Sequence, residues 1–600
     1  MLKKLSLIIL SNLIFILYFL HYYVPLGDFT LSLTINFMVF ILPGVGWLNV
    51  FFRRGISDRP AFTFWTAFLS TVLFTAGILI HLALRININS FSQFIYLAVV
   101  TNIGILISRF SLIDKKEAIS IRTFSRYFII CILFLTVYTS AYISSVYITP
   151  PLEDHDFERQ ATAYGLVKHF RPYLLTDRKT LFYFAHPPLM HFYSAYTMLF
   201  SDKLDRMKYY YDIAVEAADI LKKEFQQGDT FCFSDSHVSG MCAEIIEVKN
   251  GYLRFDARLP EKIDIGYNRF VSVSGGMLDI DTVKKARLWQ LIKEEYSYFN
   301  NQPYLLETRM PNLLFSALAA MVFFYLTFHL TKSWQLSLLG TFVFFTLPQV
   351  FILSAAGLDI ALTNFLLISL AYGYITFRKF NVGESLTLFS IGLLSAWATQ
   401  VAVILPMAVI AREYLLYLKS PRIKQILGSP AVTGFICGTV LFWIYGMIID
   451  SSTFFLDHIR YHIWDRIFHI NSLGYGSYPS IYDLWKRFAY ELGYPLFFLG
   501  AGSLLVSLLK AKIIDVRETV LSFWSLIGAI VFSIVDWKDS AHLVFVIPAL
   551  IIVVCIFVSR QKFNIKLWLI LILFYAVFRN IWFIFKISEN FQLIEPPGGW

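Results

Sequence analysis

Apolar segments long enough to cross a membrane recur along most of the chain, separated by short polar stretches. As a helix, a segment of roughly 18 to 25 apolar residues spans a hydrocarbon core about 30 Å thick. The pattern therefore predicts a polytopic α-helical membrane protein with about 15 transmembrane helices (range 13 to 15). The expected spans are 5–25, 30–52, 61–84, 90–110, 126–147, 311–331, 333–355, 360–377, 385–400, 401–418, 427–449, 491–510, 518–535, 541–559 and 564–583.

The first apolar segment, Leu5 to Val24, follows two lysines, an arrangement that secretory signals share with membrane anchors. No cleavage site of small residues comes after it, so we expect it to be retained as an anchor.

The membrane pattern is interrupted between residues 201 and 308, where the chain becomes polar. Helices are expected at Leu204–Gln226 and Asp281–Tyr298. Strands are expected at Thr230–Ser234 and in a hairpin of Met241–Lys249 and Tyr252–Arg258, which turns at Asn250-Gly251. We predict a small α+β insert exposed to water, whose Cys232 and Cys242 could form a disulfide in an oxidising compartment.

One further apolar stretch runs from His186 to Phe200. It is short for a crossing, and Pro187 and Pro188 suit the first turn of a helix. We expect an interfacial helix that lies along the outer leaflet.

Charge sets the orientation of the predicted spans. The net charge is +10, and the Lys and Arg residues cluster in alternate loops. These loops are 52–59, 115–126, 378–379, 412–424, 510–517 and 560–562. Because basic loops stay in the cytoplasm, we expect a cytoplasmic N-terminus and outer segments at 148–308, 357–359 and 450–490. The charge is thereby explained without a nucleic-acid partner.

Composition agrees with this interpretation. The chain is 57% hydrophobic and 15% charged, with a mean hydropathy of +0.61. Such a composition excludes an ordinary water-soluble globular protein and indicates an integral membrane protein. We expect it in the plasma or inner membrane.

Charged residues of the outer segments are the candidates for chemistry, because an ionised group in the bilayer centre costs on the order of 3 kcal/mol. Residues 153–159 read Glu-Asp-His-Asp-Phe-Glu-Arg. The alternative for this cluster is an N-cap followed by a solvated acidic turn. Each of the other candidates also has an interpretation without chemistry. Asp359 could be a helix N-cap, Arg309 could anchor a helix at the lipid head groups, and 458–466 could be an interfacial helix.

Five short motifs occur in one order on the predicted outer side. They are Glu153-Asp154-His155-Asp156, His186-Pro187-Pro188-Leu189, Arg309-Met310-Pro311 at the start of a span, Asp359 within 357–362, and Lys538 ahead of Pro548. Over roughly 126–560 this set resembles the C-type membrane glycosyltransferases (GT-C). More narrowly, it resembles their protein O-mannosyltransferase and aminoarabinose-transferase branch. The chain departs from the family pattern where His155 follows Asp154 and where Gln400 replaces an expected lysine.

The resemblance implies a GT-C-like fold and an inverting transfer of a sugar to an acceptor hydroxyl on a protein, lipid or glycan. The donor would be a polyprenyl-phosphate sugar in the outer leaflet, used on the extracytoplasmic side. Asp154 is the expected general base, with Asp156 as the alternative. The expected phosphate-binding residues are Arg309, Lys538, Arg466, His458 and His186. A divalent cation, Mg²⁺ or Mn²⁺, would be held by Asp359 with Asp156 and Glu158.

The predicted organisation has four parts. They are an N-terminal four-helix transmembrane extension (1–125), the first core helix and catalytic outer loop with interfacial helices (126–200), the extracytoplasmic insert (201–308), and the remaining core (309–600). The alternatives to an enzyme are a multi-span transporter of a lipid-linked or anionic substrate and a non-catalytic membrane scaffold.

Overall fold

The structure is a computed structural model that separates into two compact units. The first comprises Met1–Pro150, Phe184–Tyr193 and Arg309–Trp600, and the second Pro151–Tyr183 and Ser194–Thr308. The residues described are 2–21, 23–24, 26–51, 59–86, 88–108, 121–149, 162–163, 166–167, 173–176, 179–182, 187–200, 210–214, 230–233, 241–249, 252–256, 270–272, 305–356, 359–377, 382–416, 429–465, 481–509, 518–534 and 540–589.

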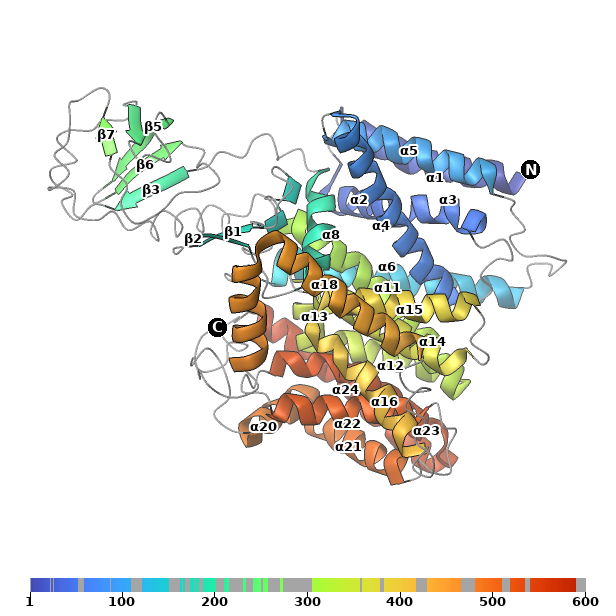
Figure 1. Ribbon diagram of the computed structural model, residues 1–600. Helices are drawn as coiled ribbons and strands as arrows, with labels where there is room; N and C mark the ends of the chain where they lie inside the picture. Colours follow the sequence, from blue (N-terminus) through green and yellow to red (C-terminus); the bar gives the residue numbers. More distant parts are fainter. Residues whose placement is uncertain are drawn as a thin grey trace. The chain divides into compact units, whose positions relative to one another are not determined.

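Helices make up the first unit (Figure 1). They are α1 (Leu2–Leu20), α2 (Asp28–Phe40), α3 (Leu42–Phe51), α4 (Arg59–Ala83), α5 (Ser90–Ile107), α6 (Ile121–Ile143), η1 (Ser144–Ile148), α11 (Leu305–Thr331), α12 (Trp334–Thr346), α13 (Pro348–Leu353), α14 (Ile360–Thr376), α15 (Val382–Ala398), η3 (Gln400–Val403), α16 (Ile404–Leu416), α18 (Pro430–Phe454), η4 (Phe455–Asp465), α20 (Ile481–Leu492), α21 (Tyr494–Leu509), α22 (Thr519–Ile534), η5 (Ser540–Phe545), α23 (Ile547–Ser559) and α24 (Phe563–Glu589). α8 (Leu189–Met198) begins in this unit and ends in the second.

A helix is present in each span expected from hydropathy. In the described residues, seven helices are long and apolar enough to cross a membrane, and an eighth span results if one bent pair counts as one. Seven further apolar helices have 10–17 residues. The chain is thus a helical integral membrane protein, whereas about 15 crossings, the orientation of the N-terminus and the four-part organisation stay predictions.

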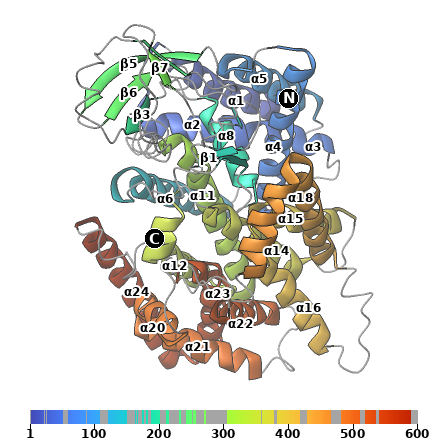
Figure 2. The same cartoon turned by 60° about the vertical axis from the view of Figure 1, so that its left-hand side comes forward.

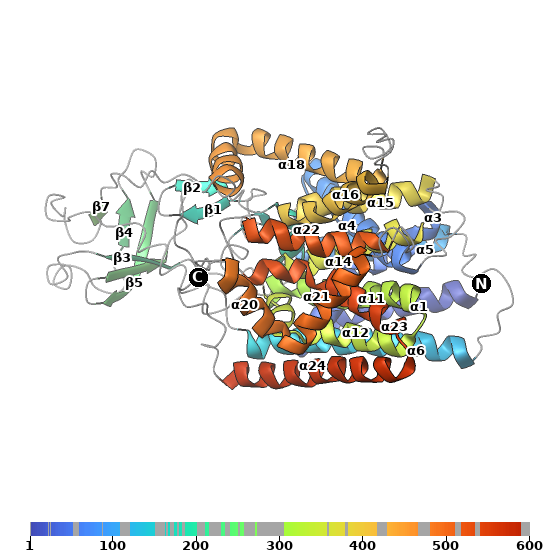
Figure 3. The same cartoon turned by 90° about the horizontal axis from the view of Figure 1, so that it is seen from below.

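Burial distinguishes the centre of the helical unit from its edge. Of the seven long spans, the one formed by α11 is the most enclosed, because 72% of its apolar 18-residue stretch is buried inside the protein. α18 and α24 lie at opposite edges in Figure 3, and only 28% and 22% of their apolar 18-residue stretches are buried. Their outward apolar side chains suit contact with lipid, because lipid tails accept such side chains at no cost.

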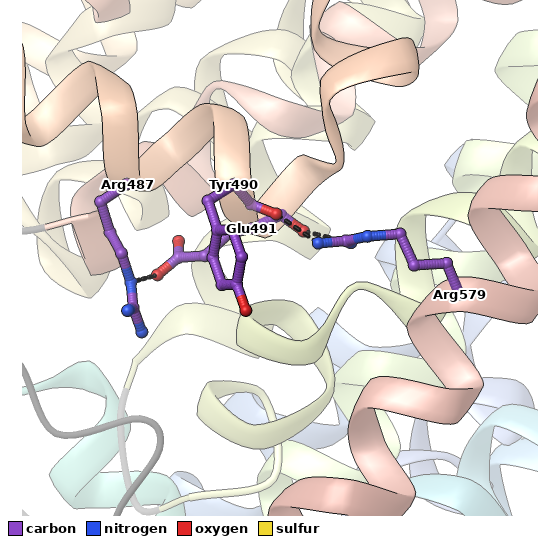
Figure 4. A network of polar contacts seen from close by, with 4 residues as sticks. All are labelled: Arg487, Tyr490, Glu491 and Arg579. Atoms are coloured by element: carbon purple, nitrogen blue, oxygen red, sulfur yellow. Dashed lines mark hydrogen bonds and ion pairs between the residues drawn. The ribbon is translucent and has the colours of Figure 1, made fainter.

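The bent pair is α20 and α21, whose axes differ by 109°. Gly493 sits at the bend with φ +81, a conformation that favours glycine. The last carbonyls of α20, at Tyr490 and Glu491, accept hydrogen bonds from the Arg579 guanidinium of α24, the second at 2.9 Å (Figure 4). Arg487 also donates to the Glu491 carboxylate at 2.6 Å. Arg579 therefore acts as a C-cap that fixes the bend.

α15 and α18 are packed at backbone distance and lie side by side in Figures 1 and 2. Gly392 of α15 and Gly434 and Gly438 of α18 each face the backbone of the partner helix. A Cβ atom added to Gly434 would lie 2.8 Å from the Phe389 Cα atom. Small residues allow this close approach, which favours helix association in a membrane.

We expect Gly434→Ala to lower the thermal stability of the purified protein, because overpacking costs about 1–3 kcal/mol. Gly502→Ala in α21 is the matched control, since a Cβ there meets nothing within 4 Å. Detergent-solubilised protein would be heated, and the folded fraction measured by fluorescence-detected size exclusion. Equal melting midpoints for the two variants would contradict the backbone contact.

The second unit contains β1 and β2, which precede the polar insert, and the five strands of the insert itself. β1 (Tyr173–Thr176) pairs with β2 (Lys179–Phe182), and β3 (Tyr210–Ala214), β4 (Thr230–Phe233), β5 (Met241–Lys249), β6 (Tyr252–Asp256) and β7 (Phe270–Ser272) form a sheet in the order β3-β6-β5-β4-β7. All pairs are antiparallel. The expected hairpin is present as β5 and β6.

The helix expected at Leu204–Gln226 is wrong, because β3 occupies part of that range. β3 pairs along its whole length with β6, so tertiary pairing overrides the helical spacing. The helix expected at Asp281–Tyr298 lies outside the described residues, and the α part of the predicted α+β insert therefore stays a prediction.

Strand register places the two cysteines of the insert opposite each other. Cys232 of β4 pairs with Cys242 of β5. Cα atoms of opposed residues in antiparallel strands are about 4.5–5.5 Å apart, within the range that a disulfide needs. We expect both thiols to be lost to a disulfide in an oxidising medium, which non-reducing peptide mass spectrometry would detect. Alkylation of both cysteines before any reduction would contradict this expectation.

The short helix α8 was expected to lie along the outer leaflet, and its place relative to the membrane stays a prediction. Of residues 187–200, all but one are buried. Within the first unit, the Tyr193 ring packs 5.3 Å from Phe40 and 5.1 Å from Phe315 between ring centres. The start of α8 is therefore packed against α2 and α11 within the first unit.

Candidate functional site

Three of the predicted site residues are described: Arg309, Asp359 and His458. The others lie outside the described residues, and their roles stay predictions. These are Asp154, Asp156, Glu158, His186, Arg466 and Lys538.

Arg309 is fully buried in the second turn of α11. Its guanidinium Nη1 donates to the carbonyl of Ser145 at 2.6 Å and to that of Thr149 at 3.0 Å. These carbonyls belong to the end of η1, a π-helical extension of α6, where a cation is favourable and backbone acceptors lack helical partners. Arg309 therefore holds the end of η1, which precedes the acidic residues 153–159 in the chain. Phosphate contact by Arg309 stays a prediction.

Asp359 is buried directly before α14, with 6% of its surface exposed. It stands at the N-cap position, yet its side chain makes no capping hydrogen bond. Asp359 thus occupies the N-cap position that the alternative interpretation gave it, but without a capping hydrogen bond from its side chain. Three residues earlier, the Ala356 carbonyl accepts a hydrogen bond from the Asn312 amide of α11.

Pro311 lies inside α11 and does not open it, because the helix begins six residues earlier at Leu305. A proline in a helix removes the hydrogen bond to the carbonyl four residues before it, here that of Glu307. In the second unit, the Thr197 hydroxyl donates to this carbonyl at 2.6 Å, and the Ser194 hydroxyl donates to the Thr308 carbonyl at 3.0 Å. The Thr197 hydroxyl thereby satisfies the carbonyl that Pro311 leaves without its helical partner.

The segments that flank the predicted site positions pack against one another. α13 contacts η1 and η5, and η5 also contacts α14. The Ser144 hydroxyl of η1 donates to the Phe351 carbonyl of α13 at 3.1 Å. η1 leads toward the acidic segment, α13 leads to Asp359, and η5 follows Lys538, so that these elements meet in one region of the first unit.

His458 is placed beside Gln400, the residue that stands where the family resemblance expects a lysine. The Gln400 amide nitrogen lies 3.1 Å from His458 Nδ1. The imidazole ring stacks on Phe454 with ring centres 5.1 Å apart and meets the edge of Phe442 at 4.8 Å. With 1% of its surface exposed, His458 has the environment of a core histidine.

Within the part of the chain that the structure describes, no three His, Cys, Asp or Glu side chains form a group that could hold a metal ion. Asp359 alone of the expected ligands is described, and its buried carboxylate suits a hard cation. A metal site there stays a prediction that depends on Asp156 and Glu158.

Sequence reasoning missed Asn36 and Asn312, which make buried hydrogen bonds around Arg309. A signal for both was present, because asparagine inside an apolar span needs partners from other helices. The sequence does not name those partners, since they come from remote parts of the chain.

Comparisons with known proteins give little further guidance. No protein-family model matches the chain, and no curated protein matches its sequence. Among solved structures, it is similar to ArnT from Cupriavidus metallidurans bound to undecaprenyl phosphate, with 10% identity and a TM-score of 0.44 over 73% of this chain. It is also similar to the apo state of that protein, with 11% identity and a TM-score of 0.41 over 74% of this chain. The chain covers 62% of the length of each. Both scores are low, and the similarity carries no conclusion about fold or activity.

Proposed function

We propose that the protein is a GT-C-type membrane glycosyltransferase that transfers a sugar from a polyprenyl-phosphate donor to an acceptor hydroxyl on the extracytoplasmic side. The observation that carries the proposal is that α13 packs against both η1 and η5, and that η5 also packs against α14. Each of these elements adjoins one of the acidic or basic positions that the family resemblance singles out. A transporter would instead favour polar groups at the membrane midplane.

The chemical step is a single displacement. The acceptor oxygen bonds to the anomeric carbon while the bond from that carbon to the phosphate oxygen breaks. The electron pair leaves with the polyprenyl phosphate, and the hydroxyl proton passes to a carboxylate, which we assign to Asp154 with Asp156 as the alternative. Attack opposite to the leaving group inverts the configuration of the anomeric carbon.

Cationic groups would stabilise the phosphate as its charge develops. We assign Lys538 and Arg466 to this role, with Arg309, His458 and His186 as further candidates. A divalent cation held by Asp359 with Asp156 or Glu158 would add positive charge beside the phosphate. The acceptor is left as a hydroxyl of a protein, lipid or glycan.

The proposal is tested with purified protein in nanodiscs and a panel of radiolabelled polyprenyl-phosphate sugars. We expect time-dependent release of labelled sugar to an acceptor, together with formation of free polyprenyl phosphate. The same purified protein, reconstituted in sealed vesicles, would be assayed for movement of the intact donor across the bilayer. Movement without cleavage of the sugar would favour a transporter, and neither cleavage nor movement for any donor would favour a scaffold.

A further inference from the structure

The second turn of α11 contacts three other elements through neighbouring residues. Arg309 binds the carbonyls of η1, the Met310 carbonyl accepts from Asn36 of α2 at 2.9 Å, and Asn312 binds the Ala356 carbonyl beyond α13. Arg309, Met310 and Asn312 are at most 1% exposed. One helical turn thus joins the segment before Asp154 to the segment before Asp359.

Asn36 connects this turn to the N-terminal extension. Its amide donates to the Tyr138 hydroxyl of α6 at 3.0 Å as well as to Met310. The Ser32 hydroxyl of α2 lies 2.8 Å from the same Tyr138 oxygen. All three side chains are fully buried. Because α6 continues into η1, Asn36 and Arg309 tie the same two helices together at two levels.

We propose that Arg309 and Asn312 are positioning residues that set the spacing between η1 and the segment that follows α13, and that Asn36 of α2 holds the turn that carries them. The inference rests on the proposed function for the role of Asp154 and Asp359. If Asn36 holds this turn, the N-terminal extension helps to shape the site through a contact within the protein, which forms whether or not substrate is bound.

Geometry separates positioning by Arg309 from direct phosphate binding. One nitrogen of the guanidinium reaches two carbonyls four residues apart, that of Ser145 in η1 and that of Thr149 directly after it. Lysine keeps the charge, but its ammonium lies one atom closer to the backbone than Nη1 and falls short of two fixed carbonyls, whereas a bound phosphate can shift to meet it. Arg309→Lys therefore distinguishes the two roles.

The first experiment measures amide hydrogen exchange by mass spectrometry in the full chain, and it does not require activity. Asn36→Leu is compared with Asn12→Leu, the matched control, whose amide pairs reciprocally with Asn102 at 3.0 Å between α1 and α5. We expect Asn36→Leu to speed exchange about tenfold in peptides covering 144–149, as loss of a buried hydrogen bond implies. Asn12→Leu is expected to leave those peptides unchanged.

Arg309→Lys and Asn312→Leu are expected to speed exchange in peptides covering 144–149 and 353–361, respectively. Unchanged exchange in all three variants would overturn the inference, even if sugar transfer is observed. Equal acceleration at 144–149 by Asn12→Leu would overturn it too, because the effect would then reflect general loosening of the extension.

The second experiment uses the donor that proves active in the transfer assay. We expect Asn36→Leu and Arg309→Lys each to lower kcat about tenfold or more, with little change in KM for the donor. A rise in KM for the donor with unchanged kcat in Arg309→Lys would assign this residue to phosphate binding and overturn its positioning role. Absence of turnover in the wild type would count against the proposed function and leave the exchange experiment to decide the positioning role.

Discussion

Asp154→Asn is expected to slow sugar transfer about a thousandfold, because an amide cannot accept the proton of the acceptor hydroxyl. The substitution keeps the size of the side chain, so binding of the donor should persist. Initial rates would be measured with saturating donor and varied acceptor, and KM for the donor would be determined separately. We expect the loss to fall almost entirely on kcat.

Asp156→Asn is the matched comparison, since it removes a like charge from the same cluster two residues away. We expect a smaller loss, of about tenfold, if Asp156 only contributes to the local charge. The reverse order of the two effects would transfer the role of base to Asp156. Full activity in both variants would exclude this acidic segment from the chemistry.

Asp359→Asn is expected to lower the transfer rate about a hundredfold and to remove the dependence on divalent cations. Asp359 is buried at the N-cap position of α14, and its carboxylate makes no capping hydrogen bond to that helix. The wild type would be stripped with a chelator and titrated with Mg²⁺ or Mn²⁺, and its rate compared with that of the variant. An unchanged wild-type rate after stripping would refute the metal role.

Thermal stability serves as the control for this variant. Removal of a buried carboxylate that serves chemistry alone should leave the melting midpoint unchanged or raise it, because burial of a charge is costly. A large fall in the melting midpoint, with activity proportional to the folded fraction, would instead assign Asp359 a structural role.

The helical part of the fold was predictable because the bilayer restricts the choices of the chain. An apolar segment of about 20 residues must satisfy its backbone hydrogen bonds internally, and only a helix does so within one segment. α14 (Ile360–Thr376) was expected at 360–377 and α5 (Ser90–Ile107) at 90–110, so position and length followed from hydropathy. The number of about 15 crossings stays a prediction, because several of these helices are shorter than a membrane crossing needs.

The polar insert shows where local pattern is insufficient. The hairpin of β5 and β6 was predictable, since Asn250-Gly251 specifies a tight turn between two β-prone segments. The segment of β3 carries helical spacing but pairs with β6, about 40 residues away in the chain. Pairing with a remote strand leaves little trace in a local sequence window.

The sequence by itself determined that this is a helical membrane protein and singled out Arg309 and Asp359 as exceptional polar residues, because apolar surroundings make such groups costly. Only the tertiary structure decided what they contact. Arg309 binds carbonyls at the end of η1, and Asp359 makes no capping hydrogen bond from its N-cap position. Asn36, in a helix that the sequence assigned to an extension, binds the turn of α11 that carries Arg309. Buried polar groups must find partners, yet those partners lie hundreds of residues apart, and only the packing of the helices brings them together.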